Sequence, residues 1–246
     1  MKSTDTITIG EYVAQDFRTA AVFAKYGIDF CCKGNRTLQE ACSKKSVSPD
    51  VLQNEIDGVL TTKSDTAIDF LSWPLDLLTD YIEKTHHRYV EEKIPHLLMF
   101  LNKLCKVHGE RHPELFEINN LFYESAGELT QHMKKEELIL FPHISKMVQS
   151  SITRQPMATP HFGSINNPIT MMRHEHDTEG ERFKRIAQLS QNYAPPADAC
   201  NTYKVTFAML QEFEQDLHKH IHLENNILFP KAEEMAQTLF SDSNLI

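Results

Sequence analysis

The chain has 246 residues and a formal net charge of -9 at pH 7, with 41% hydrophobic and 24% charged residues. This composition is typical of a globular protein, and the length suits an ordinary domain with a small additional one. The acidic balance lacks the clustered Lys and Arg of a nucleic-acid-binding surface, so we expect no nucleic-acid partner. The sequence shows neither a signal peptide nor the roughly 18 consecutive apolar residues of a membrane span, so we expect a cytoplasmic protein with no membrane partner.

Residues 1–64 carry three helix signals and predict a small helical domain that bears cysteines. Thr8 and Glu11 form a capping box before an apolar periodicity that ends at Gly27, so we expect one helix of about 18 residues there. A second capping box and a Ser-Pro helix start follow, at Thr37–Glu40 and Ser48–Pro49.

A polar, aperiodic stretch near residue 65 predicts a linker, so we expect a second domain at residues 65–246. The fold class is therefore predicted to be all-α, an antiparallel four-helix bundle preceded by the small helical domain. Apolar periodicity, interrupted by Gly- and Pro-containing loops, predicts the four long helices at 74–107, 113–149, 167–191 and 197–238.

An internal repeat singles out two histidines and two glutamates. The segments His132-x-x-x-Glu136 and His220-x-x-x-Glu224 lie 88 residues apart, and each continues into Ile-Leu-Phe-Pro. Residues four apart share one face of a helix, so each segment presents an imidazole and a carboxylate in the same direction. A single His-x-x-x-Glu is more often a surface pair, but its repetition favours a shared buried site.

Two more histidines occupy corresponding places, because His87 precedes the first segment by 45 residues and His176 precedes the second by 44. An antiparallel bundle would gather four imidazoles and two carboxylates at one level of its core, which is too much buried polarity without a metal. Two carboxylate-bridged ions in a four-helix bundle favour iron or manganese, and we expect iron. The predicted metal ligands are His87, His132, Glu136, His176, His220 and Glu224, with the two glutamates as bridges.

Several polar residues near these positions have alternative interpretations. His86 either replaces His87 as a ligand or supports one, since neither periodicity nor spacing excludes it. Glu175 either orients a ligand or shuttles protons, or it is a solvated charge, and we favour the solvated charge. The other histidines lack the repeat and are predicted to be surface or structural residues: His96, His108, His112, His143, His161, His174, His218 and His222.

The five cysteines do not resemble a secreted disulfide framework, so reduced thiols are expected. Cys31 and Cys32 lie in a predicted turn, where Lys33 and the following helix would favour the thiolate form. The alternative is that the pair is buried and inert, and the sequence does not decide between the two interpretations.

The sequence Tyr-Gly-Ile-Asp-Phe-Cys-Cys at 26–32, Thr-Leu-Gln-Glu-Ala-Cys at 37–42 and the His-x-x-x-Glu repeats resemble the di-iron iron-sulfur cluster repair proteins, the ScdA/YtfE/DnrN family. The resemblance covers nearly the whole chain and implies a hemerythrin-like bundle after an N-terminal cysteine-bearing domain. It implies the same six metal ligands, with two non-haem iron ions bridged by an oxo group and carboxylates. Lys33 departs from the glycine that many members have at this position.

From the resemblance we expect a protein that repairs iron-sulfur clusters damaged by nitrosative or oxidative stress by supplying iron. Its partners would be damaged iron-sulfur proteins, a homodimer is compatible with the sequence, and Cys31 and Cys32 would assist by thiol transfer or docking. Iron donation is favoured over enzymatic turnover. Two alternatives remain: a hemerythrin-like sensor or carrier of O2 or NO, and a di-iron enzyme that reduces NO or peroxide.

Overall fold

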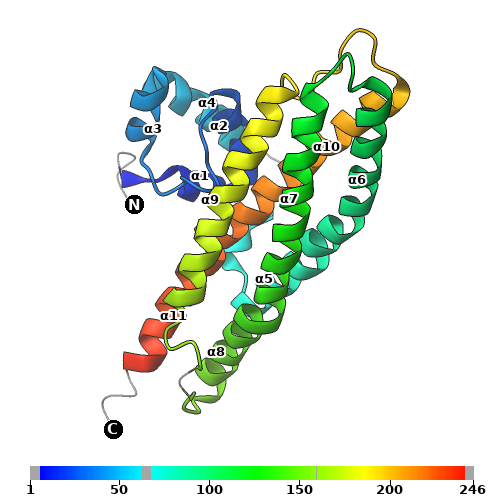
Figure 1. The fold of residues 1–246 in the computed structure, drawn as a ribbon. Coiled ribbons are helices and arrows are strands. Elements are labelled where there is room, and N and C mark those ends of the chain that lie inside the picture. Colours follow the sequence, from blue (N-terminus) through cyan, green and yellow to red (C-terminus); the bar gives the residue numbers. More distant parts are fainter. Residues whose placement is uncertain (1–5, 63–67, 159, 242–246) are drawn as a thin grey trace. The chain divides into compact units, whose positions relative to one another are not determined.

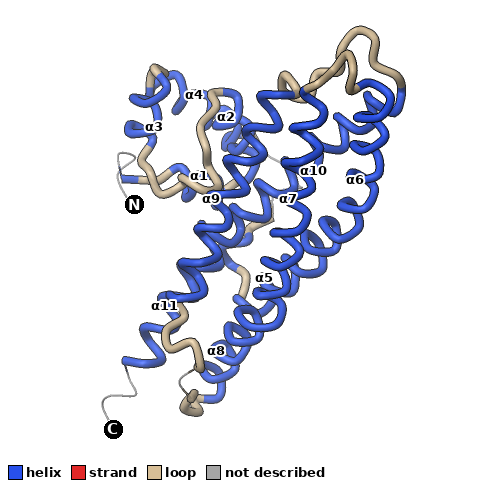
Figure 2. The backbone as a smooth tube through the Cα atoms, in the orientation of Figure 1, coloured by secondary structure: helices blue, strands red, loops and turns tan. Residues whose placement is uncertain are grey.

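The computed structural model describes residues 6–62, 68–158 and 160–241, and its regular elements are helices (Figure 2). The predicted all-α fold class is confirmed: these residues contain no strand and one isolated antiparallel bridge, between Thr8 and Thr37. None of the described helices combines the length and apolarity that a membrane span requires. The chain divides into two compact units, Thr79–His220 on its own and Met1–Leu78 together with Ile221–Ile246.

The unit Thr79–His220 is a bundle of long helices (Figure 1). Helix α6 packs against α7, and α7 packs against α9. The ring of Phe213 in α10 lies 5.4 Å from Phe122 and 5.6 Å from Phe183, so α10 closes the bundle through aromatic contacts. Its elements are α6 Arg88–His108, α7 Glu114–Lys135, α8 Phe141–Thr153, α9 Asn166–Leu189, the end of α5 Leu75–Tyr81 and most of α10 Asn201–Leu223.

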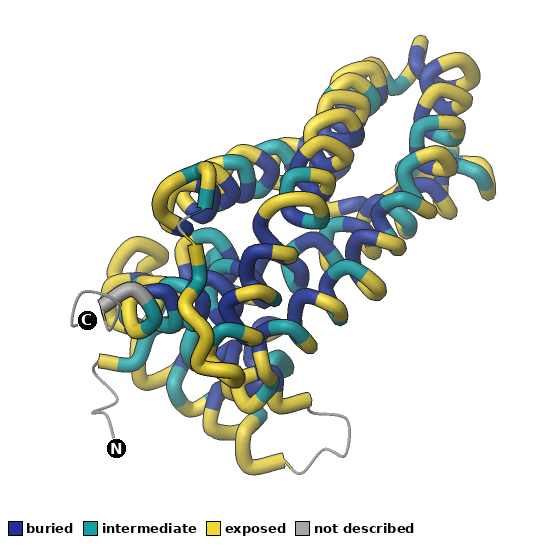
Figure 3. The backbone as a smooth tube through the Cα atoms, turned by 90° about the horizontal axis from the view of Figure 1, so that it is seen from below, coloured by how far each residue is buried: buried dark blue, intermediate teal, exposed yellow. Residues whose placement is uncertain are grey.

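Buried positions recur along the inner faces of these helices, while the outer faces are exposed (Figure 3). The core is mostly apolar, and its large aromatic residues include Tyr203 and Phe207 beside the three phenylalanines of the bundle. At one level this apolar pattern is interrupted by buried histidines and glutamates. Burying so many polar groups together costs free energy unless each has a partner.

Three of the helical runs change from α to π hydrogen bonding, over Ile82–His87, Glu136–Leu140 and Glu224–Leu228. The last two precede Pro142 and Pro230, the prolines that end the sequence repeat. Proline has no N–H to bond the carbonyl four residues earlier, so the preceding turn is free to widen. Each π segment contains or adjoins residues predicted to bind metal, as π segments often do at functional sites.

The N-terminal part of the other unit differs from the prediction at its first helix. Instead of one helix, the chain forms α1 Ile9–Gln15, a 3-10 turn Phe17–Thr19 and α2 Ala20–Lys25. Asp16 is extended, with φ of -153°, and its carboxylate accepts the N–H of Arg18 at 3.0 Å. The single-helix prediction is wrong because this side chain caps a new turn within an otherwise apolar periodicity.

The remaining predicted helix starts in this unit occur in the structure. Both capping boxes are formed, at Thr8 with Glu11 and at Thr37 with Glu40. The second opens α3 Leu38–Lys45, and α4 Pro49–Thr61 begins with its proline in the first turn.

Residues 221–246 contribute the π segment Glu224–Leu228 and helix α11 Phe229–Ser241 to the same unit. Asn226 of this segment lies against Gly10 in α1 and Gly34, where an added Cβ atom on either glycine would overlap the Asn226 side chain. The amide of Asn226 also donates to the carbonyl of Phe30 at 3.2 Å. Glycine is therefore required at both positions to let the backbone approach.

A pair of glycine substitutions tests this close approach. Gly10→Ala should lower the free energy of unfolding by about 1–3 kcal/mol, because the new methyl group displaces Asn226. Gly58→Ala, in α4 with open space around the added Cβ, should raise it by roughly 0.5–1 kcal/mol. Urea denaturation measures both, and a Gly10→Ala protein as stable as the Gly58→Ala protein would contradict the packing.

A second prediction concerns Glu214, a half-buried residue of α10. Burial raises the pKa of Glu214 from 4.5 to about 7, and the nearby hydroxyl of Tyr193 partly opposes the shift. A carboxyl whose pKa is raised by folding contributes stability below its unfolded pKa and loses it as pH rises through the folded value. Glu214→Gln should therefore be more stable than the wild type at pH 8, by roughly 1–2 kcal/mol, and similar to it near pH 4.5.

Thermal unfolding across pH 4.5–8 measures this difference. The exposed residue Glu110 provides a control, because Glu110→Gln should leave the pH profile unchanged. An identical pH profile for the wild type and Glu214→Gln would contradict the raised pKa.

Candidate metal centre

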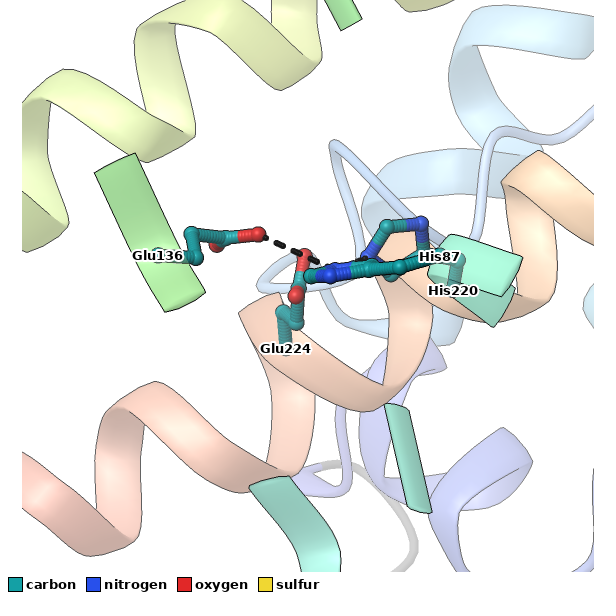
Figure 4. A group of neighbouring side chains, drawn as sticks. All are labelled: His87, Glu136, His220 and Glu224. Carbon is teal, nitrogen blue, oxygen red and sulfur yellow. Dashed lines mark hydrogen bonds and ion pairs between the residues drawn. The ribbon is translucent and has the colours of Figure 1, made fainter. Parts of the chain in front are cut away.

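Four of the predicted ligands form one buried group, His87, Glu136, His220 and Glu224 (Figure 4). Their ligand atoms all lie within 4.8 Å of one another. Nε2 of His87 is 3.2 Å from Nε2 of His220 and 3.4 Å from Oε2 of Glu136. The four side chains point toward a common centre (Figure 4).

A second buried group contains His132, Glu136, His176 and Glu224, again with all ligand atoms within 4.8 Å. Nε2 of His132 is 3.1 Å from Nε2 of His176 and 3.3 Å from Oε2 of Glu136. The structure thus brings all six predicted residues together.

The two groups share both carboxylates, because Glu136 and Glu224 belong to each. Oε2 of Glu136 lies at similar distances from His87 and His132, one imidazole of each group. The ring nitrogens of each histidine pair are 3.1–3.2 Å apart, which suits two nitrogens bound to one ion at about 2.1 Å. The arrangement therefore has the form of two adjacent cation sites with common carboxylates.

Burial makes a cation the natural complement of this site. Glu136 and Glu224 are both 0% exposed, and an ionised carboxylate removed from water needs a compensating charge. Neutral imidazoles supply nitrogen donors but no positive charge. Four imidazoles and two carboxylates at one level of the core thus fit metal ions by their chemistry as well as by their spacing.

Two further carboxylates orient the histidines from outside the groups. Glu175 accepts a hydrogen bond from Nδ1 of His132 at 2.7 Å, and Glu137 lies 3.1 Å from Nδ1 of His87. Such bonds fix the imidazole tautomer, so that the Nε2 lone pair faces the centre. The hydrogen bond to His132, with another from Lys135, lowers the pKa of Glu175 to about 2.

The favoured interpretation of Glu175 as a solvated charge is therefore wrong, because its carboxylate orients His132. The role of Glu137 was not predicted at all. The only sequence signal for Glu137 is that it directly follows Glu136. Adjacent residues of a helix point about 100° apart, so Glu137 does not share the face of Glu136, and the second repeat segment has Asn225 at the corresponding position.

His86 belongs to neither group, although its side chain is buried. Its Nδ1 lies 2.9 Å from Oδ1 of Asp216, and its ring stacks on His220 at a centroid distance of 5.6 Å. Of the two interpretations of His86, the structure favours a residue that supports a ligand.

Three other histidines are buried in structural positions. Nε2 of His108 lies 3.2 Å from Sγ of Cys200, and the ring of His143 packs edge-on against Phe162. Burial lowers the pKa of His222 to about 3, so its imidazole is neutral. None of the three belongs to a group that could hold a metal among the described residues.

Cys31 and Cys32 lie in a turn, as predicted, but the first of them is buried. A hydrogen bond with Cys32 and burial together raise the pKa of the Cys31 thiol well above its ordinary value. The expectation that this turn favours the thiolate is therefore wrong for Cys31. The reason is local, because a second sulfur and the Asp29 carboxylate face the thiol, while Lys33 is exposed.

Two family models match different parts of the chain. Residues 79–232 match the hemerythrin HHE cation binding domain, and residues 5–59 match ScdA_N, a domain of unknown function. A helical bundle with buried His–Glu groups is thus a metal-binding bundle of the hemerythrin class.

The chain is also similar to curated proteins over most of its length. It is 34% identical to the iron-sulfur cluster repair protein YtfE of Musicola paradisiaca over 225 residues, which cover 92% of this chain and 95% of the relative. The protein of the same name from Yersinia pestis is 36% identical over 215 residues, covering 87% and 91% of the two chains. The chain belongs to this family of iron-sulfur cluster repair proteins.

The carboxylates behind the histidines give a test of the centre. Glu175→Gln and Glu137→Gln should each weaken ferrous iron binding by roughly 10–100-fold, because the orienting hydrogen bond loses its charged acceptor. Glu181→Gln, an exposed position on the same helix as Glu175, should bind iron as the wild type does. Competition with a chromophoric chelator measures the affinity, and wild-type affinity in both variants would contradict the assigned support.

Proposed function

We propose that this protein repairs iron-sulfur clusters damaged by nitrosative or oxidative stress by supplying iron from a non-haem di-iron centre. The observation that carries the proposal is the pair of buried His–Glu groups with two shared carboxylates. The relatives that share most of the chain are named iron-sulfur cluster repair proteins, which supports the same function here.

In this proposal, His87 and His220 hold one iron ion, and His132 and His176 hold the other. Glu136 and Glu224 bridge the two ions, in keeping with their membership of both groups. Two carboxylates do not balance the charge of two ferrous or ferric ions, which leaves a place for an oxo bridge or another small anion. The two functional parts would be residues 1–64, with the cysteines, and residues 65–246, with the metal centre.

The ligand set suits a centre that releases its metal. Each ion would have two imidazoles and shares of two carboxylates, which is fewer protein donors than six-coordinate iron requires. Open positions allow an acceptor to bind the ion before the protein ligands leave it. Carboxylates also change between bridging and terminal binding with little movement. The residues that hold the iron are thus compatible with its transfer.

The proposed partners are iron-sulfur proteins that have lost iron, and the proposed location is the cytoplasm, where such proteins are exposed to nitric oxide. A homodimer is part of the same proposal. Cys31 and Cys32 would assist the transfer or the docking of a client.

Metal analysis and a repair assay test the proposal together. Anaerobically reconstituted wild type should hold two iron ions per chain, whereas Glu136→Leu and Glu224→Leu should lose most of this iron, because each removes a shared ligand. The protein loaded with ⁵⁷Fe should then reactivate a [4Fe-4S] enzyme damaged by nitric oxide, and the label should appear in the repaired cluster.

The outcomes separate the alternatives. Fewer than one iron per chain in the wild type would contradict the site. Reactivation without label in the cluster would contradict iron supply, and reversible O2 binding without reactivation would indicate a carrier or sensor. Glu181→Gln serves as the control for folding and loading, because its side chain is exposed.

A further inference from the structure

A second cluster of potential metal ligands lies in the turn that follows α2. Asp29, Cys31 and Cys32 each offer a ligand atom, and these three atoms lie within 4.8 Å of one another. The two Sγ atoms are 3.8 Å apart, and Sγ of Cys31 is 3.4 Å from Oδ1 of Asp29.

These spacings match the edges of a tetrahedral metal site. With metal–sulfur bonds of about 2.3 Å and metal–oxygen bonds of about 2.0–2.2 Å, two sulfurs would lie about 3.8 Å apart and a sulfur and an oxygen about 3.5 Å apart. The observed distances agree with both values. Three donors fill three corners, so the fourth is open to water or to a ligand from another molecule.

The turn is held in this shape by hydrogen bonds to its own backbone. Oδ1 of Asp29 accepts the N–H groups of Cys31 at 3.2 Å and Cys32 at 3.0 Å. The two sulfurs are thus carried by a hydrogen-bonded backbone, and Cys31 is buried while Cys32 is half-buried. A carboxylate with two adjacent sulfurs supplies donor atoms of the kind that a divalent cation of the ferrous or zinc type binds.

The same turn is bonded to the segment that carries the bundle ligand Glu224. The amide groups of Asn225 and Asn226, the two residues that follow Glu224, donate to the carbonyl of Cys31 at 3.3 and 3.2 Å. Asn226 also contacts Nδ1 of His222 at 3.0 Å. The cysteine turn and the π segment Glu224–Leu228 are therefore parts of one hydrogen-bonded structure within the same compact unit.

We propose that Asp29, Cys31 and Cys32 form a second metal site, which binds one divalent cation of the ferrous or zinc type with its fourth position open. Binding converts the two thiols into thiolates and releases their protons to solvent. The site itself does not depend on the proposed function. The further inference, that this site carries iron from the bundle to a client, rests on the proposed function.

Cobalt(II) is a suitable probe, because tetrahedral cobalt thiolate sites absorb strongly by charge transfer whereas sites of nitrogen and oxygen donors do not. The full-length protein with Glu136→Leu and Glu224→Leu should bind one cobalt ion with this absorption. Cys31→Ser and Cys32→Ser should each abolish or strongly reduce it. Asp29→Asn, which keeps an oxygen acceptor for the turn, should weaken the binding at least tenfold. Cys200→Ser, at an exposed cysteine outside the turn, should have no effect.

The wild type, first loaded with iron in the bundle, provides a second measurement that does not depend on the folding of the leucine variants. Absence of the thiolate absorption in both proteins, or its persistence in the serine variants, would overturn the site. Failure of ⁵⁷Fe transfer with an intact cobalt site would instead overturn the proposed function alone. Cobalt binding with iron transfer unaffected by Cys31→Ser and Cys32→Ser would overturn the role of the site in delivery.

Discussion

The burial of two carboxylates in the core is the constraint on which the rest of the structure depends. Glu136 and Glu224 are inaccessible to solvent, and each is grouped with two histidine pairs. Without a cation, the buried carboxylates at this level of the bundle would lower the stability of the fold, since buried charge needs compensation. With metal bound, the same residues would tie the helical runs together. Stability and metal content are therefore expected to be coupled in this protein.

The sequence was most informative where one helical face repeats. The spacing of four between histidine and glutamate, found twice, indicated four of the residues that the structure brings together, because α-helical geometry links spacing to direction. The matching offsets of 45 and 44 residues before the two segments indicated the other two, His87 and His176. Residues that support the ligands lie on other helices or other faces, so spacing does not reveal them. Glu175 and Glu137 are examples, since their partners are 43 and 50 residues distant in the chain.

Two local errors have similar causes. The apolar periodicity after Thr8 predicts one helix, but one aspartate side chain, that of Asp16, offers a competing hydrogen bond to the backbone and breaks it. At Cys31 the neighbouring Lys33 in the sequence indicates a thiol with a lowered pKa. The tertiary surroundings, a second thiol and a carboxylate, have the opposite effect on the pKa. Capping boxes were predicted well because all their interactions are local.

The π segments have a consequence for which face each helix buries. A π turn holds one residue more than an α turn, so each such segment shifts the phase of the apolar pattern by about 100°. The helix after the segment can therefore bury a different face from the helix before it. Helices α8 and α11, which follow these segments, can thus pack a different face against their neighbours while Glu136 and Glu224 keep their positions. A deletion of one residue there would restore a continuous α-helix and turn every later side chain out of register.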